Sequence, residues 1–236
     1  MKTIFHAATS RGYADHGWLK SHHTFSFANY YDPSRMHFGM LRVLNDDFVA
    51  AGMGFGTHPH SNMEIISIPL SGDLEHMDSM GHKMTIRQND VQVMSAGTGV
   101  THSEYNKNAD KEVRFLQIWI IPDTKNVAPR YMQKTFSDAE KENTFLTLVG
   151  PDNSELDLRI HQHAWISSGI FDAGSTAEYA LKDAKNGVYL FLLNGKISLG
   201  DQVLTSRDGM GIWDCDKLEM KVLEKAEILL LEIPMN

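Results

Sequence analysis

Cysteine is almost missing from the chain, because Cys215 is the only one among 236 residues. No disulfide can therefore form within the chain. A lone thiol fits a reducing compartment better than an oxidising one. Residues 1–13 also lack the apolar stretch of a secretory signal. We therefore expect a cytoplasmic protein.

Long apolar runs and basic clusters are missing as well. No stretch of about 18 apolar residues occurs, so no membrane-spanning helix is expected. The 22 Lys and Arg are outnumbered by 30 Asp and Glu, which gives a net charge of -8. Binding to nucleic acid or to an anionic membrane needs a basic surface. The composition therefore argues against both kinds of partner.

Helix signals are sparse, and strand signals dominate. Asn45–Asp47 and Asn194–Gly195 are predicted hairpin turns, and residues 137–143 a short helix capped by Ser137. The apolar runs of strand length are 38–44, 64–70, 113–121, 188–193 and 228–233. Many short strands separated by turn residues predict an all-β sandwich or barrel.

The polar segment 122–144 separates two halves that share a faint repeat. The sequence around Gly72 resembles that around Gly195, and the sequence around Asp90 resembles that around Asp208. Repeated segments of this kind indicate two similar β units. We expect an N-terminal domain at 1–125 and a C-terminal domain at 126–236.

In the register of this repeat, only the first half has imidazoles. His58 aligns with Leu181, His60 with Asp183, and His102 with Met220. The expected C-terminal domain is therefore predicted to lack a metal site.

Histidine is abundant, with 12 in the chain, and two short motifs concentrate it. His58 and His60 occur in GFGTHPH, and His102 and Glu104 in VTHSEYN. Residues i and i+2 of a strand lie about 6.6 Å apart on one face, and Glu64 continues the first face if no bulge intervenes. If the two strands are neighbours, three imidazoles and one carboxylate converge. That set suits a divalent transition ion and leaves coordination positions open for chemistry.

Each of these residues also has a structural interpretation. A single H-x-H pair on an amphipathic strand is usually solvent-facing, and Glu64 is either an acceptor for an imidazole N–H or one member of an ion pair. His161 and His163 are interpreted as ordinary strand residues, since a pair cannot complete a site that needs three protein ligands. His76 and His82 are interpreted as turn or surface residues.

Two motifs in the first half resemble those of the cupin superfamily. The first is G-x5-H-x-H-x3-E, from Gly52 to Glu64, and the second runs from Asp90 through Ser95 and His102 to Asn106. Their spacings depart from the usual cupin pattern in the way that pirins do. The segments HTFSFANYYDP, HMDSMG and LQIWIIP also match. The chain thus resembles the pirin family, and in particular bacterial pirin-like quercetinases.

The resemblance implies a bicupin, with two β-barrel, jelly-roll-like domains. It implies one metal ion in the N-terminal domain, held by His58, His60, His102 and Glu104. Iron(II) is the expected ion, and Mn, Co, Ni, Cu and Zn suit the same ligands. The implied reaction is that of a quercetin 2,3-dioxygenase, in which O₂ cleaves a flavonol and carbon monoxide is released. Glu104 is the candidate catalytic residue, as acceptor of the flavonol hydroxyl proton.

Two other functions remain open. Some pirins are non-enzymatic iron-binding proteins that act through a protein partner as redox-responsive regulators, and a fold does not fix a reaction, so another cupin enzyme is an alternative. A flat aromatic substrate needs an apolar slot. Phe38, Met40, Met53 and Phe55 are candidates for its walls, with the core as the alternative place for each.

Overall fold

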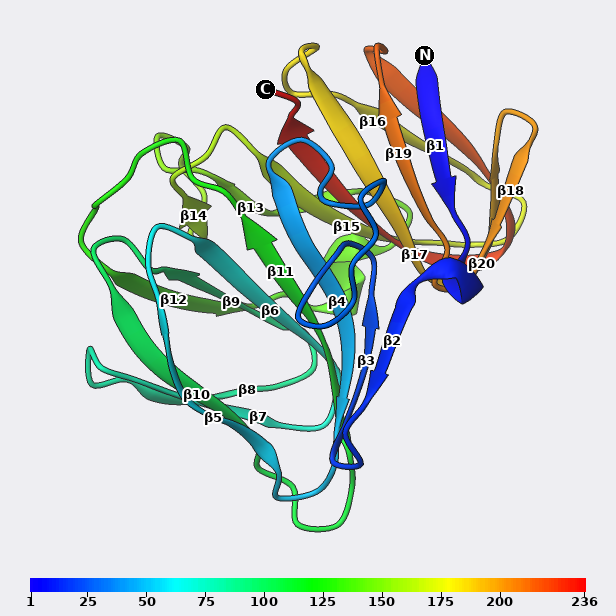
Figure 1. The fold of residues 1–236 in the computed structure, drawn as a ribbon. Coiled ribbons are helices and arrows are strands. Elements are labelled where there is room, and N and C mark those ends of the chain that lie inside the picture. Colours follow the sequence, from blue (N-terminus) through cyan, green and yellow to red (C-terminus); the bar gives the residue numbers. More distant parts are fainter.

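The computed structural model describes residues 1–236 and is built almost entirely of β-strands (Figure 1). Its helices are two short 3-10 turns, η1 (Ala8–Ser10) and η2 (Asp138–Lys141). None of its helices is long and apolar enough to cross a bilayer. The short helix expected at 137–143 is confirmed as η2. The Ser137 backbone N–H and hydroxyl donate to the Glu140 carboxylate at 2.8 and 2.7 Å and hold its first turn.

The N-terminal half forms two sheets. The strands of the larger one are β2 (Gly12–Asp15), β3 (Leu19–His23), β4 (Leu41–Val49), β6 (Glu64–Ser71), β9 (Asp90–Ser95), β11 (Val113–Ile120) and β12 (Arg130–Thr135). Those of the smaller one are β5 (Gly54–His60), β7 (Leu74–Asp78), β8 (Lys83–Ile86) and β10 (Val100–Asn106). The orders are β12-β9-β6-β11-β4-β3-β2 and β5-β10-β7-β8.

The C-terminal half forms one sheet of nine strands. They are β1 (Lys2–His6), β13 (Leu146–Pro151), β14 (Arg159–Ile160), β15 (Trp165–Phe171), β16 (Thr176–Ala180), β17 (Asn186–Leu199), β18 (Gln202–Thr205), β19 (Gly209–Trp213) and β20 (Lys217–Pro234). The main order is β1-β19-β17-β20-β15-β13-β14, while β16 pairs with β20 and β18 with β17. The long strand β17 pairs with β18, β19 and β20, and the long strand β20 pairs with β15, β16 and β17.

The repeat seen in the sequence is present in the topology. The order β12-β9-β6-β11 of one half matches β1-β19-β17-β20 of the other. The two halves therefore exchange their border strands. β1, at the N-terminus, pairs with β19 of the C-terminal sheet, and β12, which follows the N-terminal half in the chain, pairs with β9 of the N-terminal sheet. In Figure 1 the blue β1 lies among the orange and red strands of the C-terminal sheet. The predicted boundary at 125/126 stays a prediction.

The two aspartates of the repeat make the same turn. Asp90 accepts the backbone N–H of Arg87 at 2.9 Å, and Asp208 accepts that of Thr205 at 2.8 Å. The residues just before them, Asn89 and Arg207, have φ of 72° and 73°. These matching contacts show that the turns before the equivalent strands β9 and β19 have the same hydrogen bond and the same backbone conformation.

A shared core joins the halves. It contains apolar side chains of β4, β6 and β11 together with Tyr189, Phe191 and Leu231 of the C-terminal sheet. Phe38 belongs to this core, and Met40 packs against it. One face of the seven-stranded sheet is therefore covered by the C-terminal half, and the other face is left to line a cavity.

Both predicted hairpin turns are wrong. Asn45–Asp47 lies in the middle of β4, where all three residues are buried. Asn194–Gly195 lies inside β17, where the pairing register with β20 shifts. Gly195 has φ of 91°, so it forms a bulge in a continuous strand rather than a chain reversal. The expected all-β bicupin architecture is confirmed, with open jelly-roll-like sheets rather than closed barrels.

Candidate metal centre

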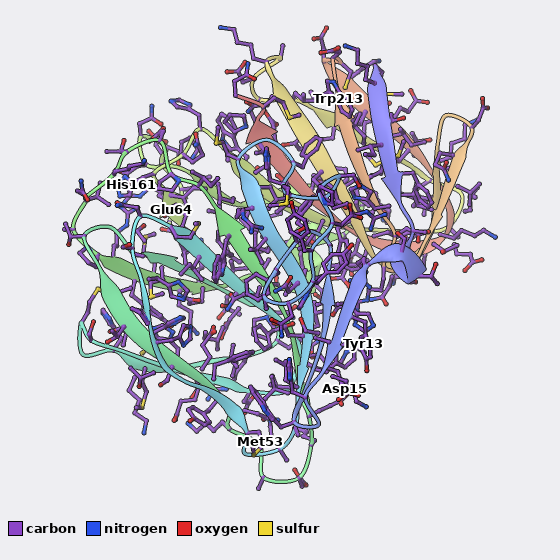
Figure 2. All side chains as sticks on the ribbon, in the orientation of Figure 1. Tyr13, Asp15, Met53, Glu64, His161 and Trp213 are labelled. Carbon is purple, nitrogen blue, oxygen red and sulfur yellow. The ribbon has the colours of Figure 1, made fainter.

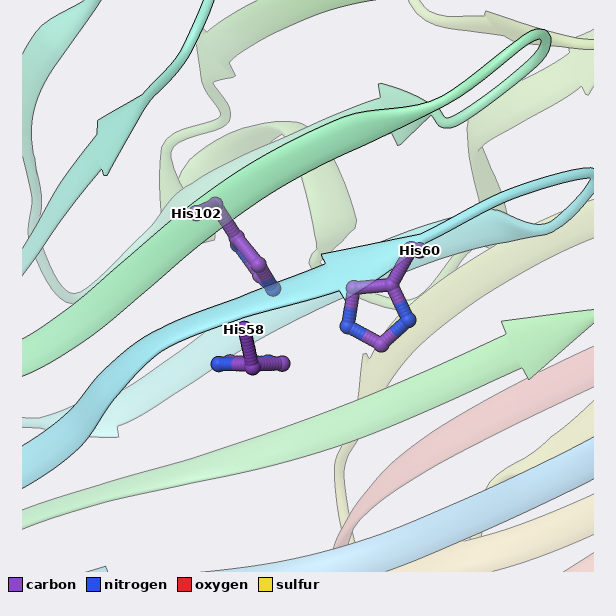
Figure 3. A group of neighbouring side chains, drawn as sticks. All are labelled: His58, His60 and His102. Carbon is purple, nitrogen blue, oxygen red and sulfur yellow. The ribbon is translucent and has the colours of Figure 1, made fainter.

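Three imidazoles converge between two neighbouring strands. His58 and His60 come from β5, and His102 comes from β10 (Figure 3). His58 lies directly opposite His102 in the antiparallel register. The ring centroids are 4.5 to 4.9 Å apart, and one nitrogen from each ring lies within 4.8 Å of the others. Three ligand atoms so placed can surround a single ion.

The hydrogen bonds of His58 and His102 leave one ring nitrogen of each with a lone pair free to bind a cation. His58 Nδ1 is 2.8 Å from the Gly56 carbonyl oxygen, so Nδ1 carries the proton and Nε2 is free. His102 Nε2 is buried and has no hydrogen-bond partner. A buried nitrogen without a partner is costly unless something else satisfies it. The residues therefore fit a cation held by the three rings.

A buried chain of side chains fixes the ring of His102. His102 Nδ1 lies 3.5 Å from Nδ1 of His76, and His76 Nε2 lies 3.0 Å from the Asp78 carboxylate. Because the carboxylate only accepts, His76 carries its proton on Nε2 and accepts from His102 through Nδ1. His102 then presents the lone pair of Nε2 to the site.

His76 was interpreted as a turn or surface residue, and that is wrong. Its side chain is fully buried on β7, together with that of Asp78. The signal was present in the sequence, because an H-x-D pair on a strand places both side chains on one face. His82, in contrast, is partly exposed and also contacts Asp78, at 3.0 Å.

Burial keeps the rings of His60 and His102 neutral. Burial, with a smaller contribution from the neighbouring His58, lowers the pKa of His60 to about 4. Burial and the nearby imidazoles lower the pKa of His102 to about 2. Metal ligation requires the neutral ring. At neutral pH both rings are therefore ready to bind a cation.

Glu104 is close to this group but does not join it. Its carboxylate lies outside the set of mutually close ligand atoms. It accepts the Gln117 amide at 2.8 Å and the Ser67 hydroxyl at 3.2 Å. Burial raises the pKa of Glu104 to about 7 and outweighs these two hydrogen bonds, which favour the charged form. The carboxylate is therefore set to exchange a proton near neutral pH.

A cavity of about 200 Å³ lies between the two N-terminal sheets, and both His58 and Glu104 line it. It is lined on one side by polar groups, which are Ser21, His23, Asn45, Asp47, Glu104 and Gln117. Its other walls include Leu19, Phe27, Phe55, His58 and Trp119. Of the four residues suggested as walls, Phe55 has this place, whereas Met53 is 44% exposed.

Asp47 is a second buried acid in the cavity that the sequence reasoning missed. Burial raises its pKa to about 7, although the Ser21 hydroxyl donates to it. The charge of Glu104 adds to this rise. No local pattern marked it, because an Asn-Asp-Asp run is typical of turns.

Glu64 does not continue the face of His58 and His60. Asn62 has φ of 49° and turns the chain, so Glu64 begins β6 in the other sheet. Its carboxylate accepts the Ser95 hydroxyl at 2.7 Å. Figure 2 shows Glu64 beside His161, at one end of the half.

His161 and His163 are not strand residues. They follow β14 in a bend, and His161 Nδ1 lies 3.7 Å from the Asp152 carboxylate.

The equivalent place in the C-terminal half is apolar. Met220 lies opposite Ala177, as His102 lies opposite His58. Both belong to a buried hydrophobic cluster, which also includes Val222 two residues further along. The repeat therefore aligns His58 with Ala177 and not with the expected Leu181.

Comparison with known proteins agrees with this architecture. The family model described as Pirin matches residues 5–120, and the one described as Quercetinase C-terminal cupin domain matches residues 147–233. A Caulobacter vibrioides protein named Pirin-like protein is 42% identical over 222 residues, covering 94% of this chain and 95% of the relative. The chain belongs to the pirin family.

Other pirins resemble the chain over its whole length. An Escherichia coli K12 protein named Quercetin 2,3-dioxygenase is 40% identical over 231 residues, with 96% of both chains covered. The crystal structure of the bacterial pirin YhhW from Escherichia coli in complex with nickel(II) matches with a TM-score of 0.93 and 37% identity, covering 99% of both chains. The pirin bicupin fold is thus confirmed along the entire chain.

Proposed function

We propose that this pirin is a metal-dependent dioxygenase that cleaves a flavonol such as quercetin with O₂ and releases carbon monoxide. The observation that carries the proposal is the convergence of three imidazoles, of which His58 lines a cavity that Glu104 also lines. The name of the Escherichia coli relative supports the same reaction.

His58, His60 and His102 are the proposed ligands of one divalent transition ion. Iron(II) is the expected ion, and Mn, Co, Ni, Cu and Zn suit the same donors. When bound, the ion supplies Lewis acidity, which lowers the pKa of a substrate hydroxyl. Asp78 and His76 keep the His102 ring in the ligating tautomer.

Glu104 is the proposed acceptor of the proton of the flavonol 3-hydroxyl. A general base works best with a pKa near the working pH, and the pKa of about 7 meets that condition. The proposal that Glu104 is instead the fourth ligand requires its side chain to leave Gln117 and Ser67.

The apolar side of the cavity suits an aromatic substrate. Phe27 and Phe55 form part of its wall, and the Trp119 ring packs edge-on against His60 with centroids 4.9 Å apart. Aromatic walls stack favourably on flat rings. These residues are proposed to orient the flavonol, and they also exclude water from the reacting face.

Flavonol-dependent O₂ uptake by anaerobically purified, metal-loaded protein tests the proposal. We expect O₂ consumption and carbon monoxide in a ratio of one to one, and neither without metal. No O₂ uptake with quercetin, together with tight binding of a protein partner, would establish the regulator instead. Much more efficient turnover of another aromatic or sugar substrate would establish a different cupin enzyme.

A further inference from the structure

A second hollow lies on the other face of the seven-stranded sheet, where β2, β3 and β4 meet the C-terminal half. Its volume is about 480 Å³. Asp46 lines it, whereas the adjacent Asp47 lines the metal cavity. Successive residues of a strand point to opposite faces, so β4 forms a wall of both spaces.

Three arginines from distant parts of the chain line this hollow. Arg11 precedes β2, Arg114 lies near the start of β11, and Arg207 lies in the turn before β19. Asp46 is the one carboxylate among the lining residues, and its side chain is 2% exposed. Three guanidinium groups facing one carboxylate leave an excess of positive charge. This is unusual in a chain whose net charge is -8.

Asp46 does not satisfy these arginines. Its carboxylate lies 3.6 Å from Arg11 Nη1 and 3.6 Å from Arg207 Nε, which is beyond good hydrogen-bond distance. Arg11 Nη1, Arg207 Nη1 and Arg114 Nε are all buried without a hydrogen-bond partner. The Arg11 side chain is itself only 5% exposed. Buried charged donors without acceptors are costly, and an additional anion would satisfy them.

The surroundings hold the guanidinium groups in place. The Arg114 guanidinium stacks on Phe48 at 4.1 Å from the ring centroid, and that of Arg11 lies 5.4 Å from the Phe191 ring. Stacked guanidinium groups are pre-organised to bind an oxyanion through two parallel N–H bonds. Hydroxyl groups from Thr9, Tyr13 and Ser206 complete the lining. Figure 2 shows Tyr13 on β2 at this edge.

Nearby titratable groups do not remove the positive charge. Burial lowers the pKa of His22, so this ring is neutral at pH 7 and adds no charge of its own. Glu227 is the next acid that acts on Arg207, and it lines a neighbouring hollow rather than this one. Asp208 is already bonded to backbone N–H groups of Ala8 and Thr205.

We propose that this hollow is a binding site for a small oxyanion, the phosphate or carboxylate group of a metabolite, held by Arg11, Arg114 and Arg207. The site is separate from the metal centre and does not depend on the proposed dioxygenase activity. Its ligand is anchored by charge and by paired hydrogen bonds, and the open side of the hollow accommodates the rest of the molecule.

Titration calorimetry at constant ionic strength, with inorganic phosphate and with benzoate as probes, tests the site. The wild type is expected to bind at least one probe saturably with one site per chain. Arg114→Gln and Arg207→Gln are each expected to weaken that binding at least tenfold. Arg87→Gln is the matched control, because Arg87 is exposed and lies outside the hollow. It should bind as the wild type does.

Asp46→Asn gives a test of opposite sign. Removing the one competing carboxylate should tighten probe binding, by about tenfold, whereas a variant that is merely destabilised would bind more weakly. Circular dichroism checks that each variant is folded. Binding of phosphate alone or of benzoate alone assigns the oxyanion class. No saturable binding of either probe by the wild type, or equal weakening in Arg87→Gln, would overturn the proposal.

Discussion

The Asp78 carboxylate accepts a hydrogen bond from His76 Nε2 at 3.0 Å, and both side chains are fully buried. This contact fixes which nitrogen of His76 faces His102, and thereby which nitrogen of His102 faces the metal position. A carboxylate that makes no hydrogen bond to a proposed ligand thus determines the protonation pattern of the centre.

Asp78→Asn should lower metal affinity by about 10- to 100-fold. An amide NH₂ facing His76 Nε2 would move the His76 proton to Nδ1, and His102 would then keep its own proton on Nε2. Metal titration followed by elemental analysis measures the effect. Asp110→Asn is the control, because Asp110 is exposed and makes no contact with the centre. Equal affinity in both variants would rule out the tautomer role.

His58→Ala should lose the metal while the β-rich circular dichroism spectrum is retained. The loss follows from removing one of three ligands that lie on already paired strands. Elemental analysis of the purified variant is the measurement. The double variant His161→Ala/His163→Ala should keep its full metal content. Metal loss in the double variant would contradict the assignment of the metal site to the N-terminal half.

Glu104→Gln should keep metal but lower kcat by about 10²- to 10⁴-fold, as expected on removal of a general base. The amide is of similar size but does not accept a proton. Steady-state O₂ uptake with quercetin is the measurement, with metal content determined on the same sample. Glu112→Gln, at an exposed position, is the control. Wild-type turnover in Glu104→Gln would exclude Glu104 both as base and as essential ligand.

The titration of Glu64 should make the free energy of unfolding fall as the pH rises. Its pKa is about 7 in the folded chain and 4.5 in the reference state, because burial outweighs the Ser95 hydrogen bond and the charge of Arg130. The native chain therefore holds a proton between these pH values that the unfolded chain has released. The stabilising contribution is full below about pH 4.5 and is lost as pH rises through 7, with a size of roughly 3 kcal/mol.

Glu64→Gln imitates the protonated side chain, so its unfolding free energy should match that of the wild type at pH 4 and exceed it at pH 8. Urea unfolding of both proteins at the two pH values gives the difference directly. The same difference at both pH values would mean that Glu64 is not the titrating group.

The sequence predicted the architecture well because strand signals and the repeat are local. Apolar runs identified strands although both predicted hairpin turns were wrong, and the Asp90 and Asp208 turns proved equivalent in their hydrogen bonds. The common face of His58 and His60 was also predictable from their i, i+2 spacing, and the structure brings His102 next to them.

Other features depend on contacts between distant strands, which no short segment reveals. Asp47 looks like a turn residue until β3, β4 and β11 enclose it in the cavity. The Arg11, Arg114 and Arg207 cluster likewise arises only when three separate segments meet. Glu64 was misplaced because the left-handed residue Asn62 turns the chain between two strands that look continuous in the sequence.

The reciprocal placement of β1 and β12 means that the chain cannot be divided into two independent halves. A gene fragment that encodes either half would produce a sheet without its border strand, and it would expose backbone groups that now pair with β19 or β9. The C-terminal half, whose equivalent place is apolar, is therefore an obligate structural companion of the half that has the imidazoles.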